Sequence, residues 1–271
     1  PPPPPPPPPP LFFFNHKPAY AQLRRLVGSE MCIRDRYIVC ILLYNCCMNQ
    51  FKNSWGFSFA NWKYFLVLGM PLIVIESLTG YLVLPLQEIT QPEDFIVFFE
   101  TNSLIIALVG VVGILIQISL IGGLWISYMA LDSQKNINPI NALYAGLSKF
   151  FPLFGAYIIV NIVSAFGFLL LILPGIYLSA RFSLFAAHIM FENKKVFKSI
   201  GASWEKTDEH GSRLFMFTLL FISLLIIVTL ILSSLLPDGI LQAFTIALAE
   251  YIIIIPLGYI YFTLYKSIKV T

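Results

Sequence analysis

The chain has 271 residues, of which 58% are hydrophobic and only 11% are charged, and its formal net charge is +3. Soluble domains carry roughly 25% charged residues, so this composition excludes a water-exposed exterior for most of the chain. A net charge this small gives no electrostatic footprint for nucleic acid, and we expect no nucleic-acid partner.

The first 47 residues differ in character from the rest of the chain. Ten prolines open the sequence, and residues 27–36 (VGSEMCIRDR) resemble the translation of a sequencing-library adapter. We therefore predict that residues 1–36 are artefactual and that residues 1–47 form a leader outside the folded domain. The apolar run at 37–47 is too short for a membrane span, which needs about 20 residues. Met48 is the expected natural start.

All four cysteines lie in this leader, at positions 32, 40, 46 and 47. A chain that starts at Met48 contains no cysteine, so we expect no disulfide, no thiolate nucleophile and no cysteine metal site. If the leader is genuine, the adjacent Cys46 and Cys47 still lack the C-x-x-C spacing of a metal or redox site. We predict no metal and no cofactor.

From Met48 onward, long apolar runs with few charges predict an all-α integral membrane protein. A single domain is expected over residues 48–271, with six transmembrane helices. The expected spans are 62–84, 103–129, 150–173, 175–191, 213–236 and 240–265. Pro174 and Gly175 separate the third span from the fourth, because proline interrupts a helix and glycine tolerates the positive φ of a tight reversal. The six spans therefore pair into three hairpins.

Basic residues accumulate at one set of ends of these spans. The links at 130–149 and 192–213 contain lysine or arginine, whereas the 85–102 link contains four acids and no base. Lysine and arginine in short loops are retained in the cytoplasm. We therefore predict six crossings with the N- and C-termini both cytoplasmic. An even number of spans also puts both termini on the same side, so the span count agrees with the charge distribution.

A short amphipathic segment precedes each expected hairpin. The residues that recur at helical spacing are Phe51, Trp55 and Phe59; Ile140, Leu143 and Leu147; and Phe197, Ile200 and Trp204. Short helices with such apolar stripes lie in the membrane interface. Asn138 and Pro139 are expected to supply a cap and a first turn for the second helix. The alternative is that any loop between spans appears amphipathic by chance.

The order of short motifs along the chain resembles a known family. The motifs are 138–147 (NPINALYAGL), 173–176 (LPGI), 181–186 (RFSLFA) and 196–204 (VFKSIGASW). Together they resemble the YciC-type family of uncharacterised bacterial inner-membrane proteins, which is similar to the membrane domain of some glycerophosphodiester phosphodiesterases. The resemblance covers residues 48–271 and implies six helices in a bacterial inner (plasma) membrane. It brings no established activity or site.

Three ionisable residues, Glu76, Arg181 and Glu250, lie within the expected spans. A lone charge at mid-membrane costs about 2.5–3.5 kcal/mol, and intramembrane charges are default candidates for a functional role. We predict that Arg181 pairs with Glu76 or Glu250 inside the bundle, either as a clamp between helices or as a relay for protons or solutes. The alternative is that the Arg181 side chain extends outward to the interface.

Two further groups of residues have local interpretations. Lys194, Lys195 and Lys198 cluster beside the third amphipathic segment, and such a cluster attracts anionic lipid headgroups. Ser179 and Ser183 belong to a strip of small residues, which favours close packing between membrane helices. We therefore predict a lipid-headgroup contact at the lysines and helix packing at the serines.

No nucleotide-binding, metalloprotease or hydrolase motif occurs in the sequence, and we do not expect an enzyme. The expected function is that of a non-catalytic multi-pass membrane protein that organises lipid or partner proteins. Its expected partners are the lipid bilayer, other membrane proteins or a second copy of the chain. The alternative is a small-solute transporter, or a subunit of one, that uses the intramembrane glutamates and arginine.

Reporter fusions test the expected topology. A fluorescent reporter that matures only in the cytoplasm should be active after residues 137, 205 and 271, and inactive after residue 95, because basic links stay inside. A phosphatase reporter that is active only outside should give the opposite pattern. Phosphatase activity at position 205 would contradict the predicted orientation.

Overall fold

The computed structural model describes residues 47–87 and 89–270, and residues 1–46 of the predicted 1–47 leader lie outside the described residues. Residues 50–271 form one compact unit. Within the described ranges the regular elements are helices, and no strand occurs there. Six of the helical segments are long and apolar enough to cross a membrane. The predicted all-α, six-span membrane fold is therefore confirmed, and the chain is a multi-pass membrane protein.

The six segments agree with the expected spans in number and order. They are Trp62–Leu86, Glu93–Asp132, Phe150–Leu170, Ile172–Glu192, Gly211–Leu235 and Ile240–Lys269. The second is much longer than expected, because α3 (Pro92–Asp132) contains 41 residues and extends about 60 Å at 1.5 Å per residue. Glu93 and Asp94 lie in its first turn, where acids stabilise the positive end of a helix. The acidic link expected at residues 85–102 is thus largely the start of α3.

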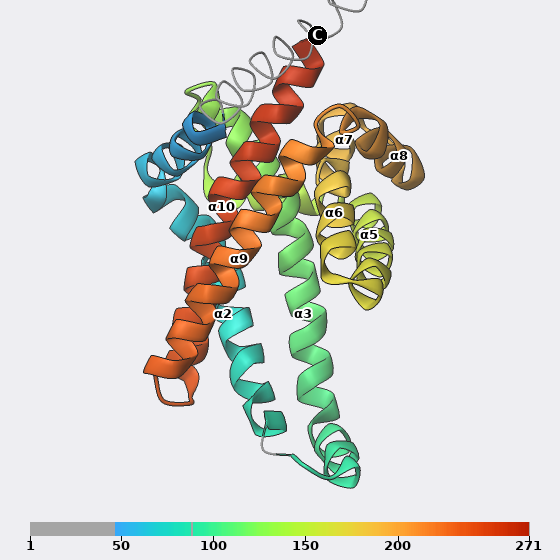
Figure 1. Cartoon of the computed structure of the whole chain (residues 1–271). Coiled ribbons are helices and arrows are strands. Elements are labelled where there is room, and N and C mark those ends of the chain that lie inside the picture. Colours follow the sequence, from blue (N-terminus) through green and yellow to red (C-terminus); the bar gives the residue numbers. More distant parts are fainter. Residues whose placement is uncertain (1–46, 88, 271) are drawn as a thin grey trace, which may run out of the picture. The chain divides into compact units, whose positions relative to one another are not determined.

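The spans form the three expected hairpins, which Figure 1 shows side by side. The elements are α2 (Trp62–Val83), the short 3₁₀ helix η1 (Leu84–Gln87) and α3; α5 (Phe150–Leu170) and α6 (Ile172–Phe182); and α9 (Gly211–Leu235) and α10 (Ile240–Val270). Helix α10 contacts α9, α2 and α3, while α6 contacts α5 and α9. The last helix of the chain therefore joins the first hairpin to the third.

The fourth span consists of two helices rather than one. Helix α6 ends at Phe182, and α7 (Phe185–Glu192) begins after two residues in turn geometry, Ser183 and Leu184. This break was not expected from the apolar run, because neither residue is a helix breaker. Side chains from another element must therefore satisfy the backbone at the break.

The reversal between α5 and α6 also differs from the expectation. The chain turns at Leu171, whose backbone is extended (φ −165°, ψ 154°), and Pro174 and Gly175 lie within the first turn of α6. Proline is tolerated there because the amides of a first turn have no partner within the helix. The predicted positive φ at Gly175 is wrong. Its missing side chain instead allows close packing, since a Cβ on Gly175 would clash with the ring of Phe168.

Each hairpin is preceded by a short helix, as predicted. Residues 50–60 are helical, and the second and third short helices are α4 (Pro139–Leu147) and α8 (Val196–Lys206). The predicted cap of α4 is confirmed, because Asn138 Oδ1 accepts a hydrogen bond from the backbone N–H of Ile140 at 3.0 Å. The repeated unit is a short helix followed by a hairpin of membrane spans.

Helix α4 packs against α3 through its small residues. Ala142 and Gly146 are buried there, and a Cβ on Gly122 of α3 would lie 2.6 Å from the Cα of Gly146. The hydroxyl of Ser119 donates to the backbone carbonyl of Leu143 at 2.6 Å. The two backbones therefore approach closely, while the side chains of Ile140 and Tyr144 are exposed on the other side of α4.

Buried side chains gather at the end of the bundle where the short helices lie. Rings from separate elements pack there, with the centroids of Phe57 and Tyr259 3.8 Å apart and nearly parallel. Tyr128 of α3 donates its hydroxyl to the carbonyl of Ile255 at 2.9 Å. Towards the opposite ends of the spans, large apolar side chains are exposed, as at Leu108, Leu169 and Leu230. This exposure suits a hydrocarbon environment, because lipid rather than protein covers those surfaces.

Alanine substitution of two glycines in short helices tests the α3–α4 contact. Gly146→Ala places a Cβ against the backbone carbonyl of Ser119 and should lower the free energy of unfolding by about 1–3 kcal/mol, as overpacking does. Gly201→Ala in α8 is the matched control, since nothing lies within 4 Å of its Cβ position. The control should be neutral or stabilising by about 0.5–1 kcal/mol. Thermal unfolding in detergent measures both, and equal stabilities would contradict the packing.

Candidate functional site

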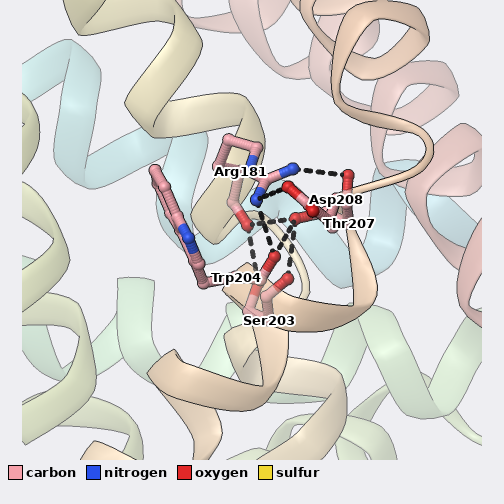
Figure 2. Close-up of polar contacts among 5 residues, drawn as sticks. All are labelled: Arg181, Ser203, Trp204, Thr207 and Asp208. Atoms are coloured by element: carbon pink, nitrogen blue, oxygen red, sulfur yellow. Dashed lines mark hydrogen bonds and ion pairs between the residues drawn. The ribbon is translucent and has the colours of Figure 1, made fainter. Parts of the chain in front are cut away.

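Arg181 occupies the last turn of α6, and its side chain is almost fully buried, with 1% exposed. Figure 2 shows its guanidinium directed at the end of α8. Nη1 donates to the carbonyl of Thr207 at 2.8 Å, and Nη2 donates to the carbonyl of Trp204 at 2.9 Å. Nη2 also lies 2.8 Å from Oδ1 of Asp208. The buried charge is therefore held by two carbonyl oxygens and a carboxylate.

This arrangement has a direct electrostatic cause. The last carbonyl groups of a helix have no partner within the helix and together carry partial negative charge. Arg181 supplies two donors to them in a fixed planar geometry, which an arginine provides and a lysine does not. The ring of Trp204 adds a cation–π contact at 4.4 Å from the guanidinium carbon. Arg181 thus acts as the C-terminal cap of α8.

The same group of residues stabilises the break in the fourth span. The hydroxyl of Ser203 donates to the backbone carbonyl of Arg181 at 2.8 Å and accepts from the backbone N–H of Leu184 at 3.2 Å. The hydroxyl of Thr207 lies 3.2 Å from that same carbonyl. Side chains of α8 and its C-cap therefore satisfy the backbone groups that the break between α6 and α7 leaves without helical partners.

Lys149 plays a comparable role at the end of α7. Its ammonium donates to the carbonyls of Ile189 at 3.1 Å and Met190 at 2.9 Å, and it also contacts Oδ1 of Asn193. Asn193 ends the helix in the left-handed conformation, with a φ of 52°. A cation at a helix C-terminus is stabilised by the helix dipole. The sequence identified Arg181 only as an intramembrane charge and Lys149 only as a base in a link. In the structure they cap two consecutive short helices, α8 and α7.

Tyrosines of α10 join the ends of α3 and α7. The hydroxyl of Tyr259 donates to Asp132 at 3.0 Å, and Lys266 forms an ion pair with the same carboxylate at 2.6 Å. The hydroxyl of Tyr265 donates to Glu192 at 2.9 Å. These contacts, together with the two cationic caps, fix the positions of the short helices against the bundle.

Arg181 does not pair with either intramembrane glutamate, contrary to the predicted ion pair. Its carboxylate partner is Asp208, whose side chain is 78% exposed. Nor does Arg181 extend outward to the interface, since it is buried. The reason is that the end of α8 supplies two carbonyl acceptors as well as a carboxylate at the same place. Arg181 and Asp208 are 27 positions apart, and the sequence gave no signal of this contact.

Glu76 and Glu250 lie together elsewhere in the structure, and both are half-buried. They line a pocket of about 460 Å³ with Asp238 and Gln242, and a second pocket of about 400 Å³ with Gln117. The structure thus brings the two predicted glutamates together from α2 and α10, without the arginine. Such a crevice can exchange protons or attract a cation, although no metal-binding group of three such side chains occurs among the described residues.

The three predicted lysines lie where α7 leads into α8. Lys194 forms an ion pair with Glu192 at 2.8 Å. Lys195 immediately precedes the first turn of α8, and both Lys195 and Lys198 are exposed. Between these two lies Phe197, whose side chain is 79% exposed. Lys195, Phe197 and Lys198 are therefore exposed close together at the start of α8.

Comparison with known proteins adds no identification. No family model matches the chain, and no curated protein and no solved structure matches it.

Substitutions at Arg181 separate the helix cap from the ion pair. Arg181→Leu removes the two guanidinium hydrogen bonds to the carbonyls of Trp204 and Thr207 and the ion pair with Asp208, and should lower the free energy of unfolding by roughly 2–5 kcal/mol. Asp208→Asn should cost less than about 1 kcal/mol, because its carboxylate is exposed and screened. Thermal unfolding in detergent measures both changes. If Asp208→Asn were as harmful as Arg181→Leu, the ion pair rather than the cap would be the principal contact.

A charge swap provides the matched control. If Arg181 paired with Glu250, the double variant Arg181→Glu/Glu250→Arg would recover stability relative to Arg181→Glu alone. We expect no recovery, because the contacts of Arg181 are with the end of α8.

Proposed function

We propose that the protein is a non-catalytic organiser of anionic lipid, and of proteins that share that lipid, at the cytoplasmic face of a bacterial inner membrane. The observation that carries this proposal is the outward apolar and basic surface of the short helices. We further propose that the chain belongs to the YciC-type family on the basis of the motifs around α4, α6 and α8. We also propose that the N- and C-termini are both cytoplasmic, a proposal that the distribution of basic residues supports.

The apolar residues of α4 and α8 support this proposal. Ile140 is 70% exposed and Phe197 is 79% exposed, while the small residues of both helices are directed at the bundle. Exposed side chains of this size at the end of a membrane bundle insert into the boundary between headgroups and acyl chains. Each short helix therefore lies against the bilayer by one face and against the bundle by the other.

Charge adds the preference for anionic lipid. Lys195 and Lys198 are exposed, and each base near an anionic surface contributes about 1 kcal/mol of attraction. The two together contribute roughly 2 kcal/mol, which is about a 30-fold increase in binding. Lys194 contributes less, because its ammonium is paired with Glu192.

Lipid binding by lysine variants tests the proposal. We expect Lys195→Gln/Lys198→Gln to bind fluorescent phosphatidylglycerol about 30-fold more weakly in detergent, and Lys195→Arg/Lys198→Arg to bind it as the wild type does. Lys194→Gln alone should weaken this binding less than Lys195→Gln alone or Lys198→Gln alone. High salt should lower the lipid affinity of the wild type towards that of the double glutamine variant. Equal binding by the wild type and the double glutamine variant would contradict the proposal.

The crevice at Glu76 and Glu250 favours a second candidate, a small-solute transporter or transporter subunit. Paired carboxylates within spans are a common feature of proton and ion pathways. Arg181 is an unsuitable member of such a pathway, because its guanidinium is engaged by α8. Proton or cation flux in proteoliposomes that is lost in Glu250→Gln would favour this candidate. Lipid binding without flux would favour the organiser.

A further inference from the structure

A pocket of about 400 Å³ lies among α3, α5, α6 and α7, apart from the lysines of the proposed lipid surface. Its polar lining consists of Tyr157, Asn161, Ser164, Ser179 and Ser183, beside the indole of Trp125. None of the described residues that line it is charged. All of its walls belong to segments that are long and apolar enough to span a membrane. The pocket is therefore an uncharged, partly polar site between membrane helices that opens to the surface of the bundle.

Two hydroxyl groups of this pocket have no hydrogen-bond partner. They are Ser164 Oγ and Ser183 Oγ, which are both buried, and the Ser164 residue is only 7% exposed. Other hydroxyls in the spans donate to the carbonyl four residues earlier, as Ser77, Ser127, Ser179 and Thr218 do. Buried polar groups are normally paired, and each exception requires an explanation. These two hydroxyls are available to a molecule in the pocket.

The break in the fourth span lies at the same place. Ser183 is the residue at which α6 ends, and it lines the pocket. Irregular backbone at membrane depth is tolerated where it is enclosed by protein or lines a cavity. Discontinuous membrane helices are also where membrane proteins place ligands. The break, the pocket and the unpaired hydroxyls are three observations at one position.

We propose that this pocket binds an uncharged polyol or its ester. A hydroxyl both donates and accepts hydrogen bonds, which suits the alcohol and ester oxygens of such a molecule. A charged ligand would be left without a counter-charge in a site of low dielectric constant. Phe168 lines the pocket and is 43% exposed, so the pocket reaches the surface of a membrane-spanning segment, where lipid has access. The ligand is therefore either the glycerol backbone of a neutral lipid or a free polyol.

Labelling with a photoreactive diacylglycerol tests this site in the full chain reconstituted in phosphatidylcholine nanodiscs. We expect labelled peptides from α5 and α6, and competition by dioleoylglycerol. Ser164→Ala and Ser183→Ala should each weaken binding by about 2- to 10-fold, because each removes one hydrogen bond. Ser77→Ala is the matched control, since Ser77 is equally buried, its hydroxyl donates to the carbonyl of Ile73, and it lies outside the pocket. It should bind as the wild type does.

Unfolding in the absence of added lipid separates binding from folding. Ser164→Ala and Ser183→Ala remove buried unpaired hydroxyls, so their stability should be unchanged or higher than that of the wild type. Competition by soluble glycerol would assign the site to free polyols, and competition by dioleoylglycerol alone would assign it to lipid. The proposal is overturned if neither competitor reduces labelling of α5 and α6, or if both alanine variants bind as tightly as the wild type. Loss of this site leaves the lysine surface of α8 unaffected, because the two share no residue.

Discussion

The contact of the Arg181 guanidinium with the end of α8 is the interaction on which much of this structure depends. A buried cation is costly unless its donors and its charge find partners. The carbonyls of Thr207 and Trp204 accept hydrogen bonds from Nη1 and Nη2, and the carboxylate of Asp208 opposes the charge, while Nε has no hydrogen-bond partner. In return, α8 is held beside the break in the fourth span. There Ser203 donates a hydrogen bond to the backbone carbonyl of Arg181 and accepts one from the backbone N–H of Leu184. One side chain thereby fixes a short helix, ends another helix and determines which face of α8 is directed outward.

Positive charge serves two purposes in this chain. The distribution of lysine and arginine predicts which ends of the spans remain in the cytoplasm. Individual cations then cap short helices, since Lys149 holds the end of α7 as Arg181 holds the end of α8. Bases that act as caps are not free to bind lipid or to relay protons. The exposed Lys195 and Lys198, and the separate pair of Glu76 and Glu250, are therefore the charged groups on which a functional proposal can rest.

The two ends of the bundle differ in what stabilises them. At the end with the short helices, aromatic rings and tyrosine hydroxyls join α3, α7 and α10. Towards the other end, the spans expose leucine and isoleucine to their surroundings and make fewer polar contacts. Helices α4 and α8 are consequently held firmly against their neighbours, and each presents exposed apolar side chains that suit the proposed contact with lipid. The neutral pocket beside Ser164 lies deeper, within the spans themselves.

Local sequence determined the spans, the cap at Asn138 and the small faces of α4, because each depends on residues within a few turns of one another. It also identified exposed lysines beside α8. Only the tertiary structure decided the partner of Arg181, the break at Ser183 and the meeting of Glu76 with Glu250. Those contacts join residues far apart in the chain, and an apolar run has no periodic signal that selects one neighbour over another. Helix packing brought the C-terminal carbonyls of α8 to Arg181. This contact replaced the ion pair with Glu76 or Glu250 that the positions of the charges in the spans had predicted.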